Sequence, residues 1–307
     1  MTPTPANANL ECLLTGITPA VVRQTPNRWR VSLPAPAGQI ELRAIDEWLC
    51  LRASVAAPGQ SPGTAPDLDL LRRQSEIGDG VKFAHDRYGR LEIRAELYLP
   101  ESSPDGREIQ ETVDHLAGAL ASALNGSSAA VYLPAPAAEP AAAARETLES
   151  SCSEAGWPFR ARPDGSLQVE LEPAALGLTA RVRPAGQSRF RATANLIELA
   201  LFDSDLTRHA LARCLLLLNG AIRGVRAGIR AQEGVEFAML EGSGGDLGSG
   251  RELAAVLSAL SVGGRLCVEE LAALTDPEIS RHYLAHRGEQ PTKSEDHNQH
   301  EEESERA

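Results

Sequence analysis

The chain has 307 residues, of which 42% are hydrophobic and 23% are charged, and its formal net charge is −12. This composition fits a globular protein with room for two ordinary domains, and its acidic balance disfavours a nucleic-acid-binding groove, which needs clustered positive charge. No apolar stretch of about 18 residues is present, and the five cysteines stand at no metal-ligand spacing, so we expect a cytoplasmic protein with reduced thiols.

The first part of the chain predicts a small α+β module at residues 10–125. Residues 1–9 are rich in Pro, Ala and Asn, and we expect this lead-in to be disordered. Alternation of apolar and polar residues predicts strands, and Asp67 is a helix cap. The expected elements, in chain order, are a helical piece at Leu10–Leu14, strands at Ala20–Gln24 with Trp29–Leu33, Gln39–Ile45 and Trp48–Val55, a helix at Leu68–Ile77, strands at Gly80–Ala84 and Leu91–Leu97, and a helix at Glu108–Leu124.

Residues 126–142 are rich in Ala and Pro, and we interpret them as the linker to a second module at residues 143–287. Ser204 or Asp203 caps a leucine-rich helix in this module, and Asn219-Gly220 is expected to end it. The expected elements are a helix at Ala143–Ala155, strands at Phe159–Arg162, Leu167–Leu171, Leu178–Arg183 and Arg189–Leu199, the leucine-rich helix at Leu206–Leu218, strands at Gly224–Ala231 and Gly234–Leu240, a helical pattern at Arg251–Leu260 that continues through Leu266–Leu274, and a helix at Pro277–His286.

The two modules share a sequence pattern. Short motifs of the first module recur in the second at offsets of 138 and 144 residues, which predicts a tandem duplication. Each copy is expected to have the order α-β-β-β-α-β-β-α with an antiparallel sheet. The recurring residues are Val31 and Leu33 with Val169 and Leu171 at the first offset, and Gly80-Val81 and Leu91-Glu92-Ile93 with Gly224-Val225 and Val235-Glu236-Phe237 at the second.

The helix Leu206–Leu218 carries an apolar arc that is too wide to be covered by one sheet. We expect its second side to pack on the helix Leu68–Ile77, so that the chain is a monomer closed into an internal pseudo-dimer. A helix sunk in one larger core would explain the same leucines and remains the alternative. The residues expected to pack between the modules are Leu70, Leu71, Leu211, Leu215 and Leu218.

No motif in the chain is a complete metal-binding or phosphate-binding signature. The glycine-rich loop Gly242–Gly250 lacks the Gly-Lys-Ser/Thr ending of a phosphate loop, which favours a flexible connection. His282 and His286 lie one helical turn apart, and His297 and His300 follow, but a Glu at the zincin position and a fixed third ligand are missing. We expect neither a metal nor a cofactor.

Acidic residues and a histidine near the start of the leucine-rich helix suggest acid/base chemistry. They are Asp203, Asp205 and His209, but Ser204-Asp205 ahead of such a helix is also the pattern of an N-cap. The chain has no Gly-x-Ser-x-Gly elbow and no Cys/His nucleophile context. We therefore expect no enzymatic activity.

The segment Ala212–Arg223, together with the element order and the acidic balance, resembles the type III secretion chaperone-like superfamily, which includes the Tir-chaperone and YbjN-type groups. In that superfamily a helix ending in Leu-x-x-x-Asn runs into the fourth strand. The resemblance covers nearly all of Ala143–Leu274 and, more weakly, Leu10–Leu124. It implies proteins that dimerise and hold an extended client segment on the sheet and the first helix, and the residues at comparable positions are Val31, Leu33, Leu148, Val169 and Leu171.

These observations predict a non-enzymatic protein-binding module, either a chaperone or an assembly adaptor, that holds a segment of a client protein. The alternative is a permanent structural or regulatory subunit of a larger protein assembly. Residues 288–307 hold seven acidic residues against Lys293 and Arg306, and we expect them to form a disordered, solubilising tail. A tail that mimics the counter-surface of a basic partner is the functional alternative.

Overall fold

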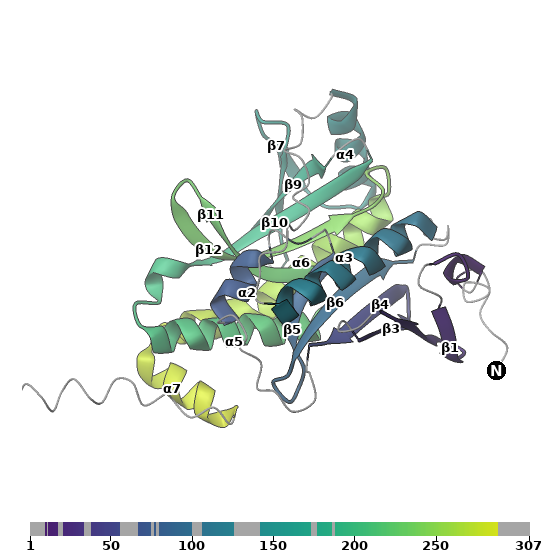
Figure 1. Ribbon diagram of the computed structural model, residues 1–307. Coiled ribbons are helices and arrows are strands. Elements are labelled where there is room, and N and C mark those ends of the chain that lie inside the picture. The colour runs from purple at the N-terminus through teal and green to yellow at the C-terminus, as the bar shows by residue number, and fades with distance from the viewer. Residues whose placement is uncertain are drawn as a thin grey trace, which may run out of the picture.

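The computed structural model shows two similar α+β halves, each built on one antiparallel sheet (Figure 1). The expected fold class is therefore confirmed. The structure describes residues 10, 12–17, 21–33, 38–55, 67–74, 77, 80–99, 106–125, 142–172, 177–185 and 188–287. The expected lead-in, the acidic tail and all of the expected linker except Ala142 lie outside these residues.

The first half forms a six-stranded sheet because its strands alternate buried apolar residues with polar ones. The strand order is β1-β2-β3-β4-β6-β5. In the last hairpin, β5–β6, the second strand β6 therefore pairs with β4, and the first strand β5 forms the edge of the sheet. The elements are β1 (Val21–Thr25), β2 (Arg28–Ser32), β3 (Gln39–Ile45), β4 (Trp48–Ser54), α2 (Asp67–Arg73), β5 (Val81–His85), β6 (Leu91–Tyr98) and α3 (Gly106–Asn125).

The second half repeats this order, with its sheet arranged as β7-β8-β9-β10-β12-β11. Its middle helix begins at a capping box, in which Ser204 and Thr207 satisfy each other's backbone N–H groups. The elements are α4 (Ala142–Glu154), β7 (Phe159–Ala161), β8 (Leu167–Glu170), β9 (Thr179–Ala185), β10 (Arg189–Glu198), the short 3-10 helix η2 (Leu199–Leu201), α5 (Asp205–Ala221), β11 (Val225–Gln232), β12 (Val235–Gly244), α6 (Gly250–Ala273) and α7 (Pro277–His286).

Three details of the expected element order need correction. Four strands precede the middle helix in each half, because tight turns separate β1 from β2 and β7 from β8. α5 runs past Asn219 to Ala221, since Gly220 lets the helix lie directly against the backbone oxygen of His85. The helical pattern expected at Arg251–Leu260 and Leu266–Leu274 forms one continuous helix, α6. Gly263 and Gly264 pack closely on Leu240 and Leu178 and do not break this helix.

The pairing registers also define which residues occupy equivalent places in the two sheets. Val81 lies opposite Ala95 in the first sheet, and Val225 lies opposite Gly242 in the second. The offset is therefore 144 between β5 and β11, as expected, but 147 between β6 and β12. The expected match of Leu91 with Val235 is out of register by three residues, because the second hairpin is three residues longer.

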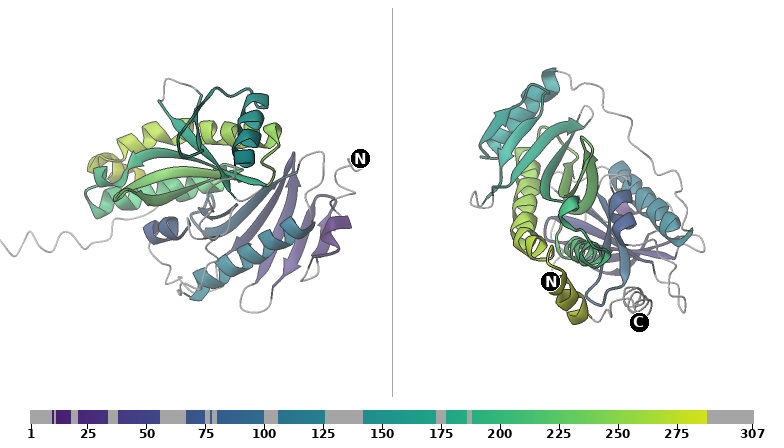
Figure 2. Two further views of the ribbon diagram at one scale, coloured as in Figure 1. Left: turned by 90° about the horizontal axis from the view of Figure 1, so that it is seen from above. Right: turned by 90° about the vertical axis from the view of Figure 1, so that its left-hand side faces the viewer.

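One face of each sheet is covered by helices of its own half (Figure 2). α3 packs on β4, β5 and β6 through buried residues such as Ile109 and Leu116, and α6 packs on β10, β11 and β12 through residues such as Leu253 and Leu260. α4 packs on β9 and α6. The opposite face of each sheet carries the polar residues of the alternating pattern.

The two halves meet through their middle helices. α2 packs against α5 and β11, while α5 packs against β5, so each middle helix covers the edge strand of the other half. Figure 2 shows the halves one above the other, with α5 end-on near the middle of the second view. α5 also contacts β11, α6 and α7, which accounts for the width of its apolar arc.

Buried cations in β5 and β11 reach across this junction in a reciprocal way. Lys82 Nζ donates to the carbonyl of Val225 at 3.1 Å and to that of Ile222, and Arg226 Nη1 donates to the carbonyl of Val81 at 2.9 Å. Lys82 and Arg226 are separated by the same 144-residue offset. Their partners within each half are Glu96, 2.7 Å from Lys82, and Glu241, which is hydrogen-bonded to Arg226.

Two side-chain amides close the inner edges of both sheets. The Asn219 amide accepts from Ala227 N–H and donates to the carbonyls of Phe83 and Ala227 at 2.8 and 3.0 Å. The Gln74 amide accepts from Phe83 N–H at 2.7 Å and donates to Ala227 O. Phe83 and Ala227 are equivalent positions of β5 and β11, so the edge-facing N–H and C=O groups of these two residues find partners at the junction.

Candidate functional site

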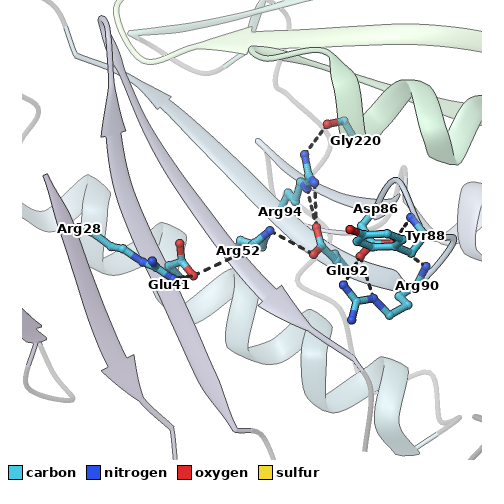
Figure 3. Close-up of polar contacts among 9 residues, drawn as sticks. All are labelled: Arg28, Glu41, Arg52, Asp86, Tyr88, Arg90, Glu92, Arg94 and Gly220. Atoms are coloured by element: carbon cyan, nitrogen blue, oxygen red, sulfur yellow. Dashed lines mark hydrogen bonds and ion pairs between the residues drawn. The ribbon is translucent and has the colours of Figure 1, made fainter. Parts of the chain in front are cut away.

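A row of alternating charges crosses the open face of the first sheet (Figure 3). Glu41 on β3 lies 2.7 Å from Arg28 on β2 and 3.4 Å from Arg52 on β4. Glu92 on β6 continues the row, 3.4 Å from Arg52 and 2.8 Å from Arg94. We call Arg28, Glu41, Arg52, Glu92 and Arg94 the charge ladder. Each acid in the ladder is shared by two guanidinium groups.

The charge ladder is partly open to solvent and ends against the second half. The Arg28 and Arg52 side chains are 43% and 45% exposed, while that of Glu92 is 4% exposed. Burial would raise the pKa of Glu41, but Arg28 and Arg52 outweigh it and hold that pKa below its ordinary value. Arg94 donates to the carbonyl of Gly220 at the end of α5, so the ladder is tied to the other half.

A groove of about 290 Å³ lies beside the ladder, between the first sheet and the end of α5. Its floor comes from β3, β4 and β6, and its wall from residues 220–223 of the second half. Arg43, Cys50 and Glu96 line it, and Arg223 on the wall forms an ion pair with Asp46 at 3.1 Å. The groove is polar and open, and both halves are needed to form it.

The turn between β5 and β6 presents an exposed aromatic ring beside this face. Tyr88 is 66% exposed, with the guanidinium carbons of Arg87 and Arg90 4.6 and 5.2 Å from its ring centroid. Asp86 fixes the turn by accepting from the backbone N–H groups of Tyr88 and Arg90 at 2.8 and 2.9 Å. Burial opposes the ionisation of Asp86, but these bonds and the Arg90 side chain keep its pKa below the ordinary value.

The outer edge of each sheet contrasts with the closed inner edge. Among the described residues, β1 pairs only with β2 and β7 pairs only with β8. β1 is largely exposed and carries Val22, which is 62% exposed. An edge strand with unpaired N–H and C=O groups can accept an extended peptide as a further strand.

The residues expected to contact a partner lie in the cores of the two halves. Val31, Leu148 and Val169 are fully buried, Leu171 is 1% exposed, and Leu33 is partly buried against the core. They occupy the helix-covered face of each sheet or, for Leu148, the helix that packs on it. Contact with a partner therefore remains a prediction that would require the covering elements to move.

The residues expected between the modules lie on α2 and α5, the helices that pack on each other. They are all buried: Leu70, Leu71, Leu211, Leu215 and Leu218 are between 0% and 8% exposed. Sequence reasoning missed the polar residues of the same junction, namely Gln74, Lys82, Asn219 and Arg226. Lys82 is one of only two lysines in the chain and stands in an otherwise apolar strand, which is a signal that could have identified it.

The glycine-rich loop does not present free amides to an anion. Gly242 and Gly244 belong to β12, where added Cβ atoms would meet Val256 and Phe190. The Glu252 carboxylate accepts from the N–H groups of Gly245 and Asp246 at 2.9 and 3.0 Å. A side chain of the protein thus occupies the position that a phosphate would take.

The histidines singled out in the sequence do not assemble a metal site in the described part of the chain. His282 and His286 lie on α7, and no group of three or more His, Cys, Asp or Glu residues that could hold a metal ion is present there or elsewhere among the described residues. His297 and His300 lie outside these residues. Asp205 lies in the first turn of α5, directly after the N-cap residue Ser204 in sequence. No helix among the described residues has the length and apolar character needed to cross a membrane.

Comparison with known proteins gives a distant structural likeness. A part of this chain amounting to 43% of its length is similar to 98% of the Yersinia pestis type III secretion chaperone SycH, solved in complex with a stable fragment of YscM2, with a TM-score of 0.27 and 17% sequence identity. No family model matches the chain, and no curated protein matches it in sequence. A likeness of this strength carries no conclusion about function.

Proposed function

We propose that this chain is a non-enzymatic protein-binding module, a chaperone or assembly adaptor that holds an extended segment of a client protein. The observation that carries this proposal is the difference between the sheet edges. Gln74 and Asn219 close the inner edges β5 and β11, whereas the outer edges β1 and β7 each pair on one side only among the described residues. Two outer edges in one chain can accept added strands.

The short and irregular form of the two outer edges fits a reversible contact. β1 carries an irregularity between Arg23 and Thr25, and β7 has only three residues, so neither edge is a long flat template for permanent pairing. A client strand added at β1 would place alternate side chains on the face that carries the charge ladder. Backbone hydrogen bonds would supply affinity, and the charges would select the client sequence.

The sharpest test places a photo-crosslinking amino acid at Val22 on β1. Val262 on α6 is the matched control, because it is also an exposed valine, at 44% against 62%. After irradiation in an extract of cells that express the protein, mass spectrometry should find adducts to an extended segment of a small set of proteins at position 22 only. Equal adducts at both positions, or none at position 22, would refute strand addition at this edge.

The second candidate function is a permanent subunit of a larger assembly. It is favoured by an exposed apolar pair on α6, where Val262 and Leu266 lie one turn apart and are 44% and 53% exposed. This candidate predicts adducts at position 262 that persist through purification in high salt. If the protein purifies as a stable monomer and no adducts form at position 262, the result favours the first proposal, a chaperone or adaptor that binds its client transiently.

A further inference from the structure

The open face of the second sheet carries several arginines close together. Arg183 on β9 lies directly opposite Arg191 on β10, and like charges at such positions repel each other. Arg181 shares this face and pairs with Asp164. Arg191 and Arg230 lie 3.9 and 4.0 Å from the same carboxylate, that of Glu241, which also forms an ion pair with Arg226. We call Arg181, Arg183, Arg191 and Arg230 the arginine face.

The registers show one difference between the two sheets. Arg183, Arg191 and Ser243 lie opposite one another across β9, β10 and β12, and the equivalent row in the first sheet is Arg43, Cys50 and Glu96. The second sheet therefore has one more arginine and one fewer carboxylate in this row. Burial and the guanidinium groups of Arg230, Arg191 and Arg181 lower the pKa of Arg183 from its ordinary value. Such a cluster is stabilised by an anion.

A groove of about 410 Å³ lies beside the arginine face and is lined in part by Arg181. Besides Arg162, Arg181 and Asp164 it is lined by groups that hydrogen-bond to peptide backbone, among them the side chains of Gln168, Thr193, Asn195 and Gln232. Amides and hydroxyls beside guanidinium groups suit a chain that carries carboxylates.

We propose that the arginine face binds the acidic segment 288–307 of this same chain. The segment has seven acidic residues against two basic ones, with three consecutive glutamates at Glu301–Glu303. It follows α7, which packs on α5, and α5 in turn contacts β11, the strand that carries Arg230. Twenty extended residues span about 66 Å at roughly 3.3 Å each, well beyond the diameter of a small domain of about 30 Å, so the segment can reach the face.

The contact is weak for each ion pair but is favoured by tethering. An exposed pair contributes little alone, and a tethered segment has an effective concentration in the millimolar range. The contact should therefore form at low ionic strength and dissolve at high ionic strength. It lies within one chain and does not depend on the proposed binding of a client.

The test uses the full chain with a nitroxide spin label on a cysteine introduced by Ser304→Cys. Cys12→Ser and Cys50→Ser remove the two cysteines that are not buried. At about 0.05 M salt, the backbone amide NMR signals of Arg183, Arg191 and Arg230 should lose intensity selectively relative to those of β3 and β4. The intensity should return at about 0.5 M salt, where screening shortens the range of the charges.

Charge-reversal variants test whether the acidic segment binds the arginine face in particular or positive surface charge in general. Arg183→Glu with Arg230→Glu should abolish the selective loss of signal, whereas Arg43→Glu, at the position of the first sheet equivalent to Arg183, should leave it unchanged. Should the double variant fail to fold, the salt dependence of the parent chain decides. Uniform broadening over both sheets, no broadening at low salt, or equal sensitivity to Arg43→Glu would overturn the proposal.

Discussion

Asn219 shows at the scale of one residue how the junction is held. It is 1% exposed, and its amide forms hydrogen bonds with the backbone of Phe83 and of Ala227, which lie on two different strands. Asn219→Ala leaves a buried N–H and a buried carbonyl without this partner, so the free energy of unfolding should fall by about 3 kcal/mol. Asn195→Ala, which removes an exposed amide contact with Gln232, should change it by about 0.5 kcal/mol or less. Urea denaturation of both variants checks this, and equal losses would contradict it.

His85 gives the junction a pH dependence. It lies between α2 and α5, with Asp67 3.6 Å from Nε2 and Arg213 beside the ring. Burial and Arg213, with a smaller effect of His209, lower its pKa from 6.5 to about 3, although Asp86 opposes the shift. The unfolded chain therefore takes up a proton on His85 below pH 6.5, whereas the folded chain does so only near pH 3. Stability from this group is complete above pH 6.5 and falls as the pH decreases.

The free energy of unfolding should fall by roughly 1.5 kcal/mol between pH 6.5 and 5 because of His85 alone. The lowered pKa values of Glu41 and Asp86 add their own loss only near and below the ordinary pKa values of these groups, 4.5 and 3.8. Urea denaturation at the two pH values should show a smaller fall for His85→Gln than for the parent chain. An identical fall in both proteins would mean that His85 is protonated normally in the folded state.

At the scale of elements, Gly220 sets the distance between α5 and β5. A Cβ at this position would collide with the backbone oxygen of His85, whereas a Cβ at Gly118 in α3 meets nothing within 4 Å. Gly118→Ala should stabilise the protein by about 0.5–1 kcal/mol through helix propensity. Gly220→Ala should destabilise it by about 2 kcal/mol, because the helix must move away from the strand. Thermal unfolding of the two variants gives the signs, and a stabilising Gly220→Ala would contradict the close contact.

Most elements could be predicted from local pattern, and the errors have physical causes. The alternation in Gln39–Ile45 and the Pro277 start of α7 gave the observed bounds, because both signals are local. Asn219-Gly220 has the composition of a helix end, but the contact with β5 requires a glycine inside the helix. The three-residue shift of β12 was invisible because Phe237–Leu240 is a continuous apolar run, in which alternation does not distinguish the two faces of the strand.

The surface was less predictable than the fold, since it depends on which face of each sheet is covered. Val31 and Val169 have the alternation of strand residues, but alternation does not tell a helix-covered face from an open one. The charge ladder comes from four strands, β2, β3, β4 and β6, and β6 lies far from the other three in sequence. Its members could be assigned to strands beforehand, but their pairing required the register.

At the scale of the whole molecule, the pair of Lys82 and Glu96 couples the first sheet to the second half. Both side chains are buried, at 1% and 7% exposure, and burial lowers the pKa of Lys82 against the attraction of Glu96. Lys82→Met alone leaves a buried carboxylate unpaired and should cost about 3–5 kcal/mol. Lys82→Met combined with Glu96→Leu should cost less than Lys82→Met alone. Chemical denaturation of the single and double variants tests this, and strict additivity would show that the two charges are not coupled.

The central claim is that the two halves close against each other through their inner strand edges and leave the outer edges free. Amide hydrogen exchange of the free protein tests it most directly. The Phe83 and Ala227 amides, bonded to Gln74 and Asn219, should exchange as slowly as amides in the central strands β4 and β10, while outward amides of β1 and β7 exchange rapidly. Rapid exchange at Phe83 and Ala227, together with protection at β1 and β7, would contradict the claim.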